Sequence, residues 1–361
     1  MKKSLCEISN PKQWKTISTD MLTETGYPVY GANGIIGYYS TYNHDCETLL
    51  ITCRGATCGS LNICQPFSYV NGNAMALDSL SADIDIRYLY YYLLNRGLND
   101  VITGSAQPQI VRQSLEKVIV EYPELNIQKS IVETLDKISK IISLRKQQLS
   151  KLDELVKSRF IELFGTEAEL DRWSCCTIGD VADVCVGVVI KPTQYYTDKG
   201  VPAFRSLNIG EMHVKDADWV YFTEEGHQKN QKSVIRKNDV LVVRSGAPGT
   251  ACVATEKYEG YNAVDIIIAH PDNSKVNSVF LAAYTNMPHG MTQIREKTGG
   301  AAQQHFNVGG YKAMRLIMPP MELQEQFATF VEQTDKSKFE IQQSLEKLET
   351  LKKALMQKYF G

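Results

Sequence analysis

Two arginines lie at similar places in the two halves of this 361-residue chain, and both could contact nucleic acid. Arg54 follows the strand-like run 49–52, Arg244 follows the run 240–243, and a glycine-containing turn comes after each arginine. A guanidinium can donate two hydrogen bonds to guanine, Asn or Gln can pair with adenine in a similar way, and Tyr can bond a phosphate. The candidate contacts in the neighbouring loops are Asn33, Tyr38, Arg54, Asn71 and Gln107 in the first half, and Arg205, Asn208, Arg244, Gln303 and His305 in the second.

Side chains with the spacing of a known catalytic or metal-binding motif are missing from the sequence. Cys53, Cys58 and Cys64 lack the paired Cys-x-x-Cys spacing of a structural zinc site, and the six histidines are scattered. There is no phosphate-binding loop, no Asn/Asp-Pro-Pro-aromatic motif of an amino-methyltransferase and no metal-nuclease motif. We therefore expect a non-catalytic chain that holds no metal ion and no cofactor of its own.

Composition and charge narrow the class of protein. The chain is 43% hydrophobic, it contains no apolar run of the roughly 20 residues that span a bilayer, and residues 1–11 are polar, without the apolar core that is typical of a signal peptide. Nine irregularly placed cysteines suit a reducing compartment, so we expect a cytoplasmic globular protein without a membrane partner. The net charge is −2, with 9 Lys/Arg against 10 Asp/Glu in residues 1–120 and 16 against 17 in residues 166–320. Proteins that hold DNA by phosphate contacts alone are usually basic, so any positive surface here is local or belongs to a partner.

The chain repeats itself at an offset of 196 residues. Gly104, Ala106 and Gln107 return as Gly300, Ala302 and Gln303; Pro123 and Gln128 return as Pro319 and Gln324; both halves end on Phe-Gly, at residues 164–165 and 360–361. The earlier parts match loosely: segments 14–17 and 173–178 resemble two copies of one entry strand, and the turn at 54–59 resembles that at 244–249. The sequence therefore predicts a duplicated frame whose loops differ, as expected for a binding protein with two different targets.

Two long helices are predicted, at 125–164 and after Pro320. Neither segment contains Gly or Pro before its end, and apolar residues recur in steps of three and four, as in a helix packed along another helix. We expect an antiparallel pair, each helix near 57 Å long at about 1.5 Å per residue, although each helix could instead pack on its own domain. The predicted contact stripe consists of Ile131, Leu135, Ile138, Ile142, Leu149, Leu152 and Val156, with Phe327, Val331, Thr334, Ile341, Leu345, Leu348 and Leu355.

The last turns of both helices hold more apolar residues than one stripe can cover. Such a surplus is typical of a surface on which another protein docks. The predicted docking residues are Phe160, Phe164, Leu355 and Phe360.

The segments before the helices have a mixed α/β pattern, in which short β-branched or aromatic runs alternate with Gly- and Asn-rich turns. Residues 29–39 contain Asn33-Gly34 and predict a hairpin, while 87–94 and 279–286 predict short helices at matching places. We expect four segments: domain 1 at 1–120, a spacer helix at 121–165, domain 2 at 166–318 and a second spacer helix at 319–361.

This order of domain, helix, domain and helix, with a Gly-x-Ala-Gln motif before each Pro-led helix, resembles the specificity subunit of type I restriction-modification enzymes. The resemblance covers essentially the whole chain. It implies an α/β (mixed α+β) fold with a pseudo-two-fold internal repeat, in which two target-recognition domains are separated by two long helices that form an antiparallel coiled coil. It also implies that each domain recognises one half of a bipartite site in double-stranded DNA, with half-sites about one helical turn, roughly 34 Å, apart.

The same resemblance implies partner proteins. The helices would set the spacer between the half-sites and dock two methyltransferase subunits, and restriction subunits, which combine translocase and endonuclease activity, would join them. S-adenosylmethionine, ATP and Mg are then expected in partner subunits only. Two other interpretations stay open at this point: a coiled-coil scaffold whose end domains bind proteins or glycans, and an enzyme whose motif is not recognised.

Overall fold

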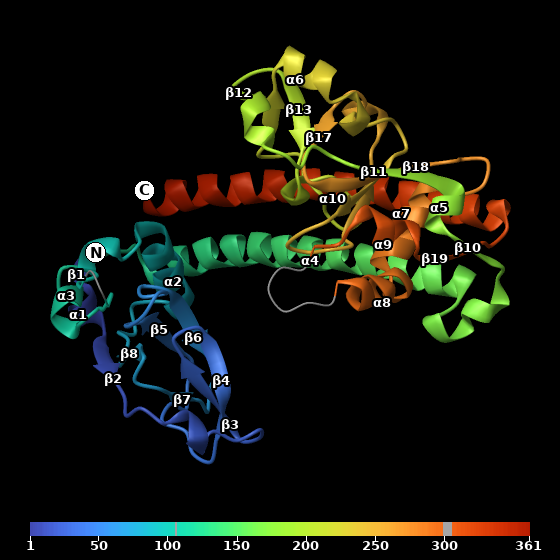
Figure 1. Cartoon of the computed structure of the whole chain (residues 1–361). Coiled ribbons are helices and arrows are strands. Elements are labelled where there is room, and N and C mark those ends of the chain that lie inside the picture. Colours follow the sequence, from blue (N-terminus) through green and yellow to red (C-terminus); the bar gives the residue numbers. More distant parts are fainter. Residues whose placement is uncertain (105–106, 299–304) are drawn as a thin grey trace. The chain divides into compact units, whose positions relative to one another are not determined.

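The computed structural model describes residues 1–104, 107–298 and 305–361, and its chain forms two compact units (Figure 1). The first unit comprises Met1–Lys146 with Gln342–Gly361, and the second comprises Gln147–Ile341. Each unit thus contains half of each long helix, which divides the chain differently from the four expected segments. Among the described residues, no helix is both long and apolar enough to cross a membrane.

The first unit combines three small β-sheets with helices. A four-stranded antiparallel sheet has the order β2-β8-β5-β6, a three-stranded sheet has the order β4-β3-β7, and β1 pairs with β9. The strands are β1 (Lys2–Ser4), β2 (Asn10–Gln13), β3 (Tyr27–Gly31), β4 (Gly34–Tyr39), β5 (Thr48–Thr52), β6 (Leu61–Cys64), β7 (Tyr69–Val70), β8 (Ala74–Asp78) and β9 (Ile119–Glu121), and the helices before the long one are α1 (Leu5–Ile8), α2 (Ile86–Arg96) and α3 (Arg112–Leu115). The central strand β5 is buried along its whole length.

The second unit repeats this plan with additions. Its sheets have the orders β11-β18-β15-β16, β12-β14-β13-β17 and β10-β19. The strands are β10 (Cys175–Thr177), β11 (Ala182–Val186), β12 (Tyr196–Thr197), β13 (Val201–Phe204), β14 (Val220–Phe222), β15 (Val240–Val243), β16 (Ala251–Val253), β17 (Asn262–Ala263), β18 (Ile266–Pro271) and β19 (Arg315–Ile317), and the shorter helices are α5 (Ile178–Val181), α6 (Glu224–Lys229), α7 (Ser278–Asn286), α8 (Pro288–Lys297) and α9 (Val308–Lys312). The predicted hairpin at 29–39 and the helices at 87–94 and 279–286 are confirmed as β3–β4, α2 and α7.

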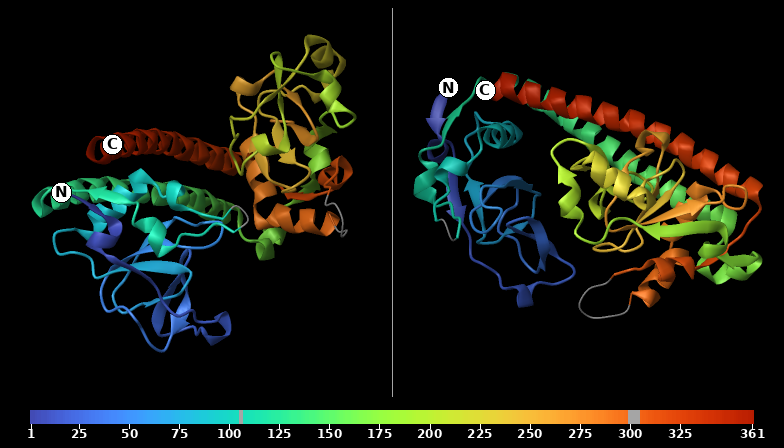
Figure 2. Two further views of the ribbon diagram at one scale, coloured as in Figure 1. Left: turned by 90° about the vertical axis from the view of Figure 1, so that its left-hand side faces the viewer. Right: turned by 45° about the horizontal axis from the view of Figure 1, so that its top comes forward.

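The two predicted long helices are single helices of 40 residues, α4 (Leu125–Phe164) and α10 (Met321–Phe360) (Figures 1 and 2). In the first unit, Ile131 and Leu135 of α4 share a core with Met356 near the end of α10. In the second unit, Val156 near the end of α4 shares a core with Val331 near the start of α10. The first half of each helix thus packs with the last half of the other, which confirms the antiparallel pairing. All residues of the predicted stripe are buried or half-buried.

Ion pairs flank this stripe in both units. Lys146 pairs with Glu349 at 2.8 Å, and Lys338, which interrupts the stripe, pairs with Asp153 at 2.7 Å. Asp153 and Glu349 are 196 residues apart, so the acidic partner of each pair occupies the same place in the repeat.

The repeated glutamines explain part of the shared frame. Gln128 and Gln324 are buried, and the side-chain oxygen of each accepts a hydrogen bond at 2.9 Å from the backbone of a helix N-cap, Asp85 before α2 and Asn277 before α7. Their side-chain nitrogens donate to the carbonyls of Pro123 and Pro319. Each glutamine therefore fixes a short helix to the start of a long one.

One predicted equivalence between the halves is wrong. Segments 14–17 and 173–178 are not two copies of one entry strand, because Trp14 follows β2, whereas Trp173 precedes β10. The true counterpart of β10 is β1, since β1 pairs with β9 as β10 pairs with β19. A helix with a capping box follows each of these strands directly, at Ser4 and at Thr177. The two tryptophans suggested a wrong alignment of the two halves, because they occupy different positions relative to the strands.

Candidate functional site

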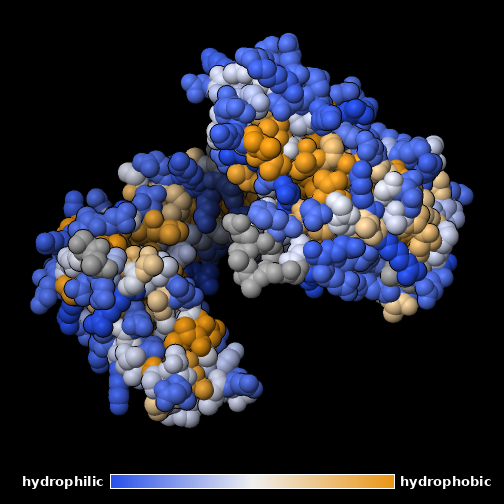
Figure 3. Space-filling model, in the orientation of Figure 1, coloured by the Kyte–Doolittle hydropathy of each residue, from blue (hydrophilic) through white to orange (hydrophobic). Residues whose placement is uncertain are grey.

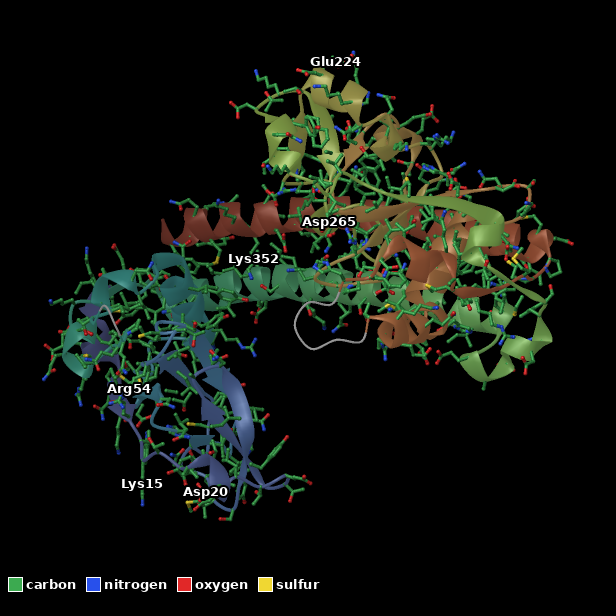
Figure 4. All side chains as sticks on the ribbon, viewed as in Figure 1. Lys15, Asp20, Arg54, Glu224, Asp265 and Lys352 are labelled. Carbon is green, nitrogen blue, oxygen red and sulfur yellow. The ribbon has the colours of Figure 1, made fainter. Side chains whose placement is uncertain are left out.

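In the first unit, three loops meet where the central strand β5 ends. The hydroxyl of Thr52 donates a hydrogen bond to the carbonyl of Ala32, which lies at the tip of the β3–β4 hairpin. The next residues pair with the segment before α3: Ile110 donates to the carbonyl of Cys53 at 3.0 Å, and Arg54 forms a β-bridge with Gln109. These contacts place exposed polar side chains together at one edge, which we call the β5 edge: Asn33, Arg54, Gln107 and Gln109. Arg54 of this edge is labelled in Figure 4.

In the second unit, the corresponding edge lies at the end of β15. The amide of Phe306 donates to the carbonyl of Arg244 at 3.0 Å, and the Ser245 hydroxyl is hydrogen-bonded to His305 Nδ1 at 2.7 Å. The Arg244 guanidinium pairs with Asp265 at 2.7 Å, and Asp265 is labelled in Figure 4. We call Arg244, Ser245, Asp265 and His305 the β15 edge. The predicted contact Gln303 lies outside the described residues, as do Ser105, Ala106 and residues 299–304.

The two arginines are not equivalent, contrary to the expectation from sequence. Ile110 and Phe306 are 196 residues apart, and they donate to the carbonyls of Cys53 and Arg244, respectively. Arg54 therefore matches Ser245, and both are followed by a glycine with positive φ, Gly55 at 91° and Gly246 at 90°. Arg244 thus occupies the place of Cys53, one position earlier than Arg54, and the one-residue shortening of the turn in the second unit lies after the glycine. The two edges thus share a backbone plan and differ in the side chains that they present.

Two predicted contacts are corrected by their burial. Asn71 is 3% exposed, and its amide bonds both the N–H and the carbonyl of Ile17. Asn208 is fully buried, accepts from the backbone of Arg205 and donates to the carbonyl of Ala217. A buried amide whose hydrogen bonds are satisfied by backbone has none left for a base. Both residues hold loops in shape, a role that sequence cannot distinguish from base contact because turns and interfaces favour the same side chains.

Two further predicted contacts lie apart from the edges or are already engaged. Tyr38 lies on β4, where it is opposite Pro28 of β3, and it is four residues from Gly34 at the hairpin tip, or about 13 Å along the strand. The guanidinium of Arg205 donates to the carbonyl of Asp218 and holds the loop that Asn208 also stabilises. The structure therefore brings together Asn33, Arg54 and Gln107 in one unit and Arg244 and His305 in the other. Sequence reasoning missed Ser245 and Asp265, whose only signal was their closeness to Arg244 and to a strand end.

The predicted docking residues divide into two kinds. Phe160 and Phe164 are fully buried in the core of the second unit, where both rings contact Phe280 and Phe327. They cannot meet a partner without unfolding that core, so their assignment to a docking surface is wrong. The surplus apolar residues Phe160 and Phe164 at the end of α4 are buried in the core of the second unit.

Leu355 and Phe360 are half-buried, and their docking role stays a prediction. Phe360 contacts the rings of Tyr88 and Tyr92 edge-on and lines an open pocket together with Tyr359.

A histidine in the core of the second unit makes stability depend on pH. His289 is 3% exposed, packs against the rings of Phe160 and Tyr284, and neither ring nitrogen has a hydrogen-bond partner among the described residues. Burial lowers the pKa of His289, because the charged form would lose its hydration. The unfolded chain, with an ordinary pKa of about 6.5, then binds the proton more readily than the folded one.

We therefore expect the free energy of unfolding to fall as the pH drops below about 6.5, by at most about 1.4 kcal/mol per pH unit from this group. The loss is complete once the pH lies below the folded pKa, and above about 6.5 His289 has no such effect. His289→Phe, which keeps an aromatic ring among aromatic neighbours, should remove this part of the pH dependence. Urea denaturation of both proteins between pH 5 and 8 measures it, and parallel pH profiles would contradict the assignment.

A second histidine stands between a carboxylate and a thiol, an order that occurs in nucleophilic catalysis. His270 Nδ1 lies 2.6 Å from Asp239 Oδ1, and its Nε2 lies 3.7 Å from Cys185 Sγ. The hydrogen bond with Asp239 raises the pKa of His270 to about 9. An imidazole that is already protonated at neutral pH cannot act as a general base, so we interpret this group as an ion pair that joins β18 to the turn before β15.

The fold and the two edges together define a class of protein: a duplicated binding protein, built from two mixed α/β units on one backbone plan and connected through paired helices. The comparisons with known proteins agree. The family model for the type I restriction modification DNA specificity domain matches residues 2–154 and 171–353, and the chain belongs to this family.

Curated relatives and solved structures carry the same description. A type I restriction enzyme specificity subunit of Haemophilus influenzae is 22% identical over 360 residues, covering 91% of this chain and 86% of the relative. The EcoprrI specificity subunit of Escherichia coli is 31% identical over 141 residues, or 38% of this chain and 35% of the relative. The crystal structure of the type I restriction-modification S subunit from M. genitalium has the same fold, with a TM-score of 0.66, 16% identity and coverage of 100% of this chain and 96% of that one.

Proposed function

We propose that this chain selects the DNA sequence for a type I restriction-modification complex, with the β5 edge contacting one half of a bipartite site and the β15 edge contacting the other. The observation that carries the proposal is the pair of edges, equal in backbone and different in side chains. Asn33, Arg54 and Gln107 offer donors and acceptors suited to adenine and guanine. The second edge offers Arg244 and His305 in a different arrangement, which suits a different half-site.

The partners follow from the family and from the charge. A net charge of −2 provides little general attraction for DNA, so two methyltransferase subunits and restriction subunits would supply most phosphate contacts. They would also hold S-adenosylmethionine, ATP and Mg, and the paired helices α4 and α10 would set the spacer between half-sites. Phe360 and Leu355 are proposed docking residues, and the complex would act on DNA in the cytoplasm.

Mapping the methylated bases of the source genome, with and without this gene, tests the proposal. Deletion should abolish methylation at one bipartite motif, which also identifies both half-sites. An unchanged methylation pattern in a strain whose partner methyltransferase is expressed and active would contradict it. The scaffold interpretation predicts that unchanged pattern.

Single substitutions should then affect one half-site each. Arg54→Ala and Arg244→Ala each remove one candidate base contact worth about 1–3 kcal/mol, so affinity should fall about 5- to 150-fold and discrimination should relax at one position. The affected position should lie in opposite halves of the motif for the two variants. Binding of the assembled complex to a panel of single-base variants of the site measures this.

The matched controls are Arg112→Ala and Arg172→Ala, which remove exposed arginines outside both edges. If these controls weaken binding as much as the edge variants do, or if both edge variants relax the same half-site, the assignment of the edges is wrong.

A further inference from the structure

The second unit presents an exposed apolar loop beside the β15 edge. We call residues 188–191 the apolar loop; in it Val189 is 45% exposed and Ile190 is 80% exposed. The loop base is fixed by backbone bonds, because Val188 donates to the carbonyl of Ala263 and accepts from the amide of Asp265. With most of its surface in water and its loop base fixed, the Ile190 side chain is accessible to a ligand.

The backbone of the loop also has an unusual conformation. Lys191 has a φ of 43°, in the left-handed region that side chains with a β-carbon rarely adopt, and Pro192 follows it. Such conformations cost of order 1–3 kcal/mol and occur most often where a loop must present a particular side chain. Here the strained residue directly follows the most exposed apolar side chain of the loop.

The surroundings of the loop indicate what it contacts. On one side, Asp265 binds the loop through its backbone and pairs with Arg244 through its carboxylate. On the other side, the loop lines an open groove of about 580 Å³ together with Gln194, Lys229, Asn230, Gln231, Lys232 and Ser233. Lys229 pairs with Glu225, and the side chains of Asn230, Gln231 and Ser233 donate to backbone carbonyls, so the groove offers a ligand chiefly the exposed Lys232 and Gln194. Cations and amides suit a phosphate backbone better than they suit an apolar protein partner.

The first unit has a matching feature next to its own edge. Ile35 and Ile36, exposed by 51% and 43%, follow the hairpin tip whose Ala32 carbonyl is bound by Thr52. Figure 3 shows that apolar residues reach the surface among polar ones on the drawn face of each unit. Ile35 and Ile36 lie on β4, whereas Val189 and Ile190 lie in the loop after β11. Because these elements are not equivalent in the repeat, the duplication of the chain does not explain why both places are apolar.

We propose that Ile190 determines part of the sequence specificity by contacting the 5-methyl group of a thymine in the major groove, and that one of Ile35 and Ile36, which lie on opposite faces of β4, does the same in the other half-site. The 5-methyl of thymine is the apolar group that the major groove presents, and aliphatic side chains are its natural contacts. The inference rests on the proposed function and adds that each half-site contains at least one such thymine.

Replacing single thymines by deoxyuridine tests the contact, because this removes the methyl group and keeps every base-pair hydrogen bond. The complex assembled from the full chain and its methyltransferase partners is titrated with its methylation-mapped site. For the wild-type chain, one deoxyuridine in each half-site should weaken binding about fourfold, the effect of removing one buried methyl group. Ile190→Ala should weaken binding to the thymine-containing site and abolish the effect of deoxyuridine in one half-site only.

Ile35→Ala with Ile36→Ala is the matched control, since it should abolish the deoxyuridine effect in the other half-site and preserve it in the first. Ile190 is mostly exposed, so its loss leaves the core intact. A wild-type complex that prefers its site but responds to no deoxyuridine overturns the methyl contact alone, as does an Ile190→Ala complex that responds like the wild type. A wild-type complex without any preference for its site overturns the proposed function instead.

Discussion

Phe164→Ala should lower the free energy of unfolding of the second unit by about 3–5 kcal/mol, whereas Phe360→Ala should cost the first unit about 1–2 kcal/mol. The two residues are equivalent in the repeat, 196 residues apart and each directly before a glycine. They differ in burial: Phe164 is fully buried among aromatic rings, and Phe360 is half-buried at the border of an open pocket. The cost of removing a ring depends on the cavity that remains, so equal changes should have unequal effects.

Hydrogen exchange in the intact chain measures both effects and locates them. In Phe164→Ala the amides of β15 and β18 should exchange faster while those of β5 and β8 stay protected, and Phe360→Ala should show a weaker effect in the first unit only. Equally small costs for the two variants, about 1–2 kcal/mol each, would mean that Phe164, like Phe360, lies at an open surface. That result would restore the docking role that burial rules out.

The long helices were predictable because their signal is redundant. Apolar contact residues recur every three or four positions over 40 residues, so a charged residue within the stripe, Arg145 or Lys338, does not disturb the period. The repeat added independent support, since Gln128 and Gln324 make the same hydrogen bonds in both units. The direction of pairing also followed, because two tandem copies related by a pseudo-two-fold axis must pair their helices antiparallel.

The candidate site was predictable only in part, for a physical reason. Asn71 and Arg54 lie in similar loops of similar composition, yet one satisfies backbone groups in the interior and the other is exposed at an edge. That difference depends on which backbone groups, far away in the sequence, the fold brings next to each side chain. A single sequence does not contain this information. The equivalence of Arg54 and Arg244 failed similarly, because an arginine beside a strand end can stand at either of two neighbouring positions, and the residue types alone do not show which one.

The apolar surplus at the helix ends shows the same limitation. Phe164 and Phe360 have the same residue type at equivalent positions of the repeat, and only the surrounding domain decides which is core. Because α7 and α8 close over the end of α4 in the second unit, Phe160 packs against Phe280 and His289. Periodicity therefore predicts which side of a helix is apolar, while burial at its ends depends on tertiary structure.

Replacing both Leu149 and Leu345 by Asp should abolish recognition of the bipartite site while each unit stays folded. Leu149 is half-buried and Leu345 is 5% exposed, and neither belongs to the main hydrophobic cores that stabilise the two units. An aspartate at each position would place an unpaired charge against the facing helix, which costs several kcal/mol and opens the middle of the pair. If the paired helices set the spacer, the two edges lose their fixed separation, and affinity should fall about 1,000-fold or more, to the level of nonspecific binding.

Competition binding of the assembled complex against scrambled DNA measures this loss, and hydrogen exchange confirms that β5 and β15 stay protected. Ser150→Asp with Thr350→Asp is the matched control, because these exposed neighbours add the same charges on the outer faces of the same helices. If the Ser150→Asp, Thr350→Asp chain binds normally while the Leu149→Asp, Leu345→Asp chain does not, the loss is caused by the opened helix pair and not by the added charge. Unchanged affinity in the Leu149→Asp, Leu345→Asp chain would mean that the helices do not set the spacer, and that each edge must find its half-site through the partner subunits.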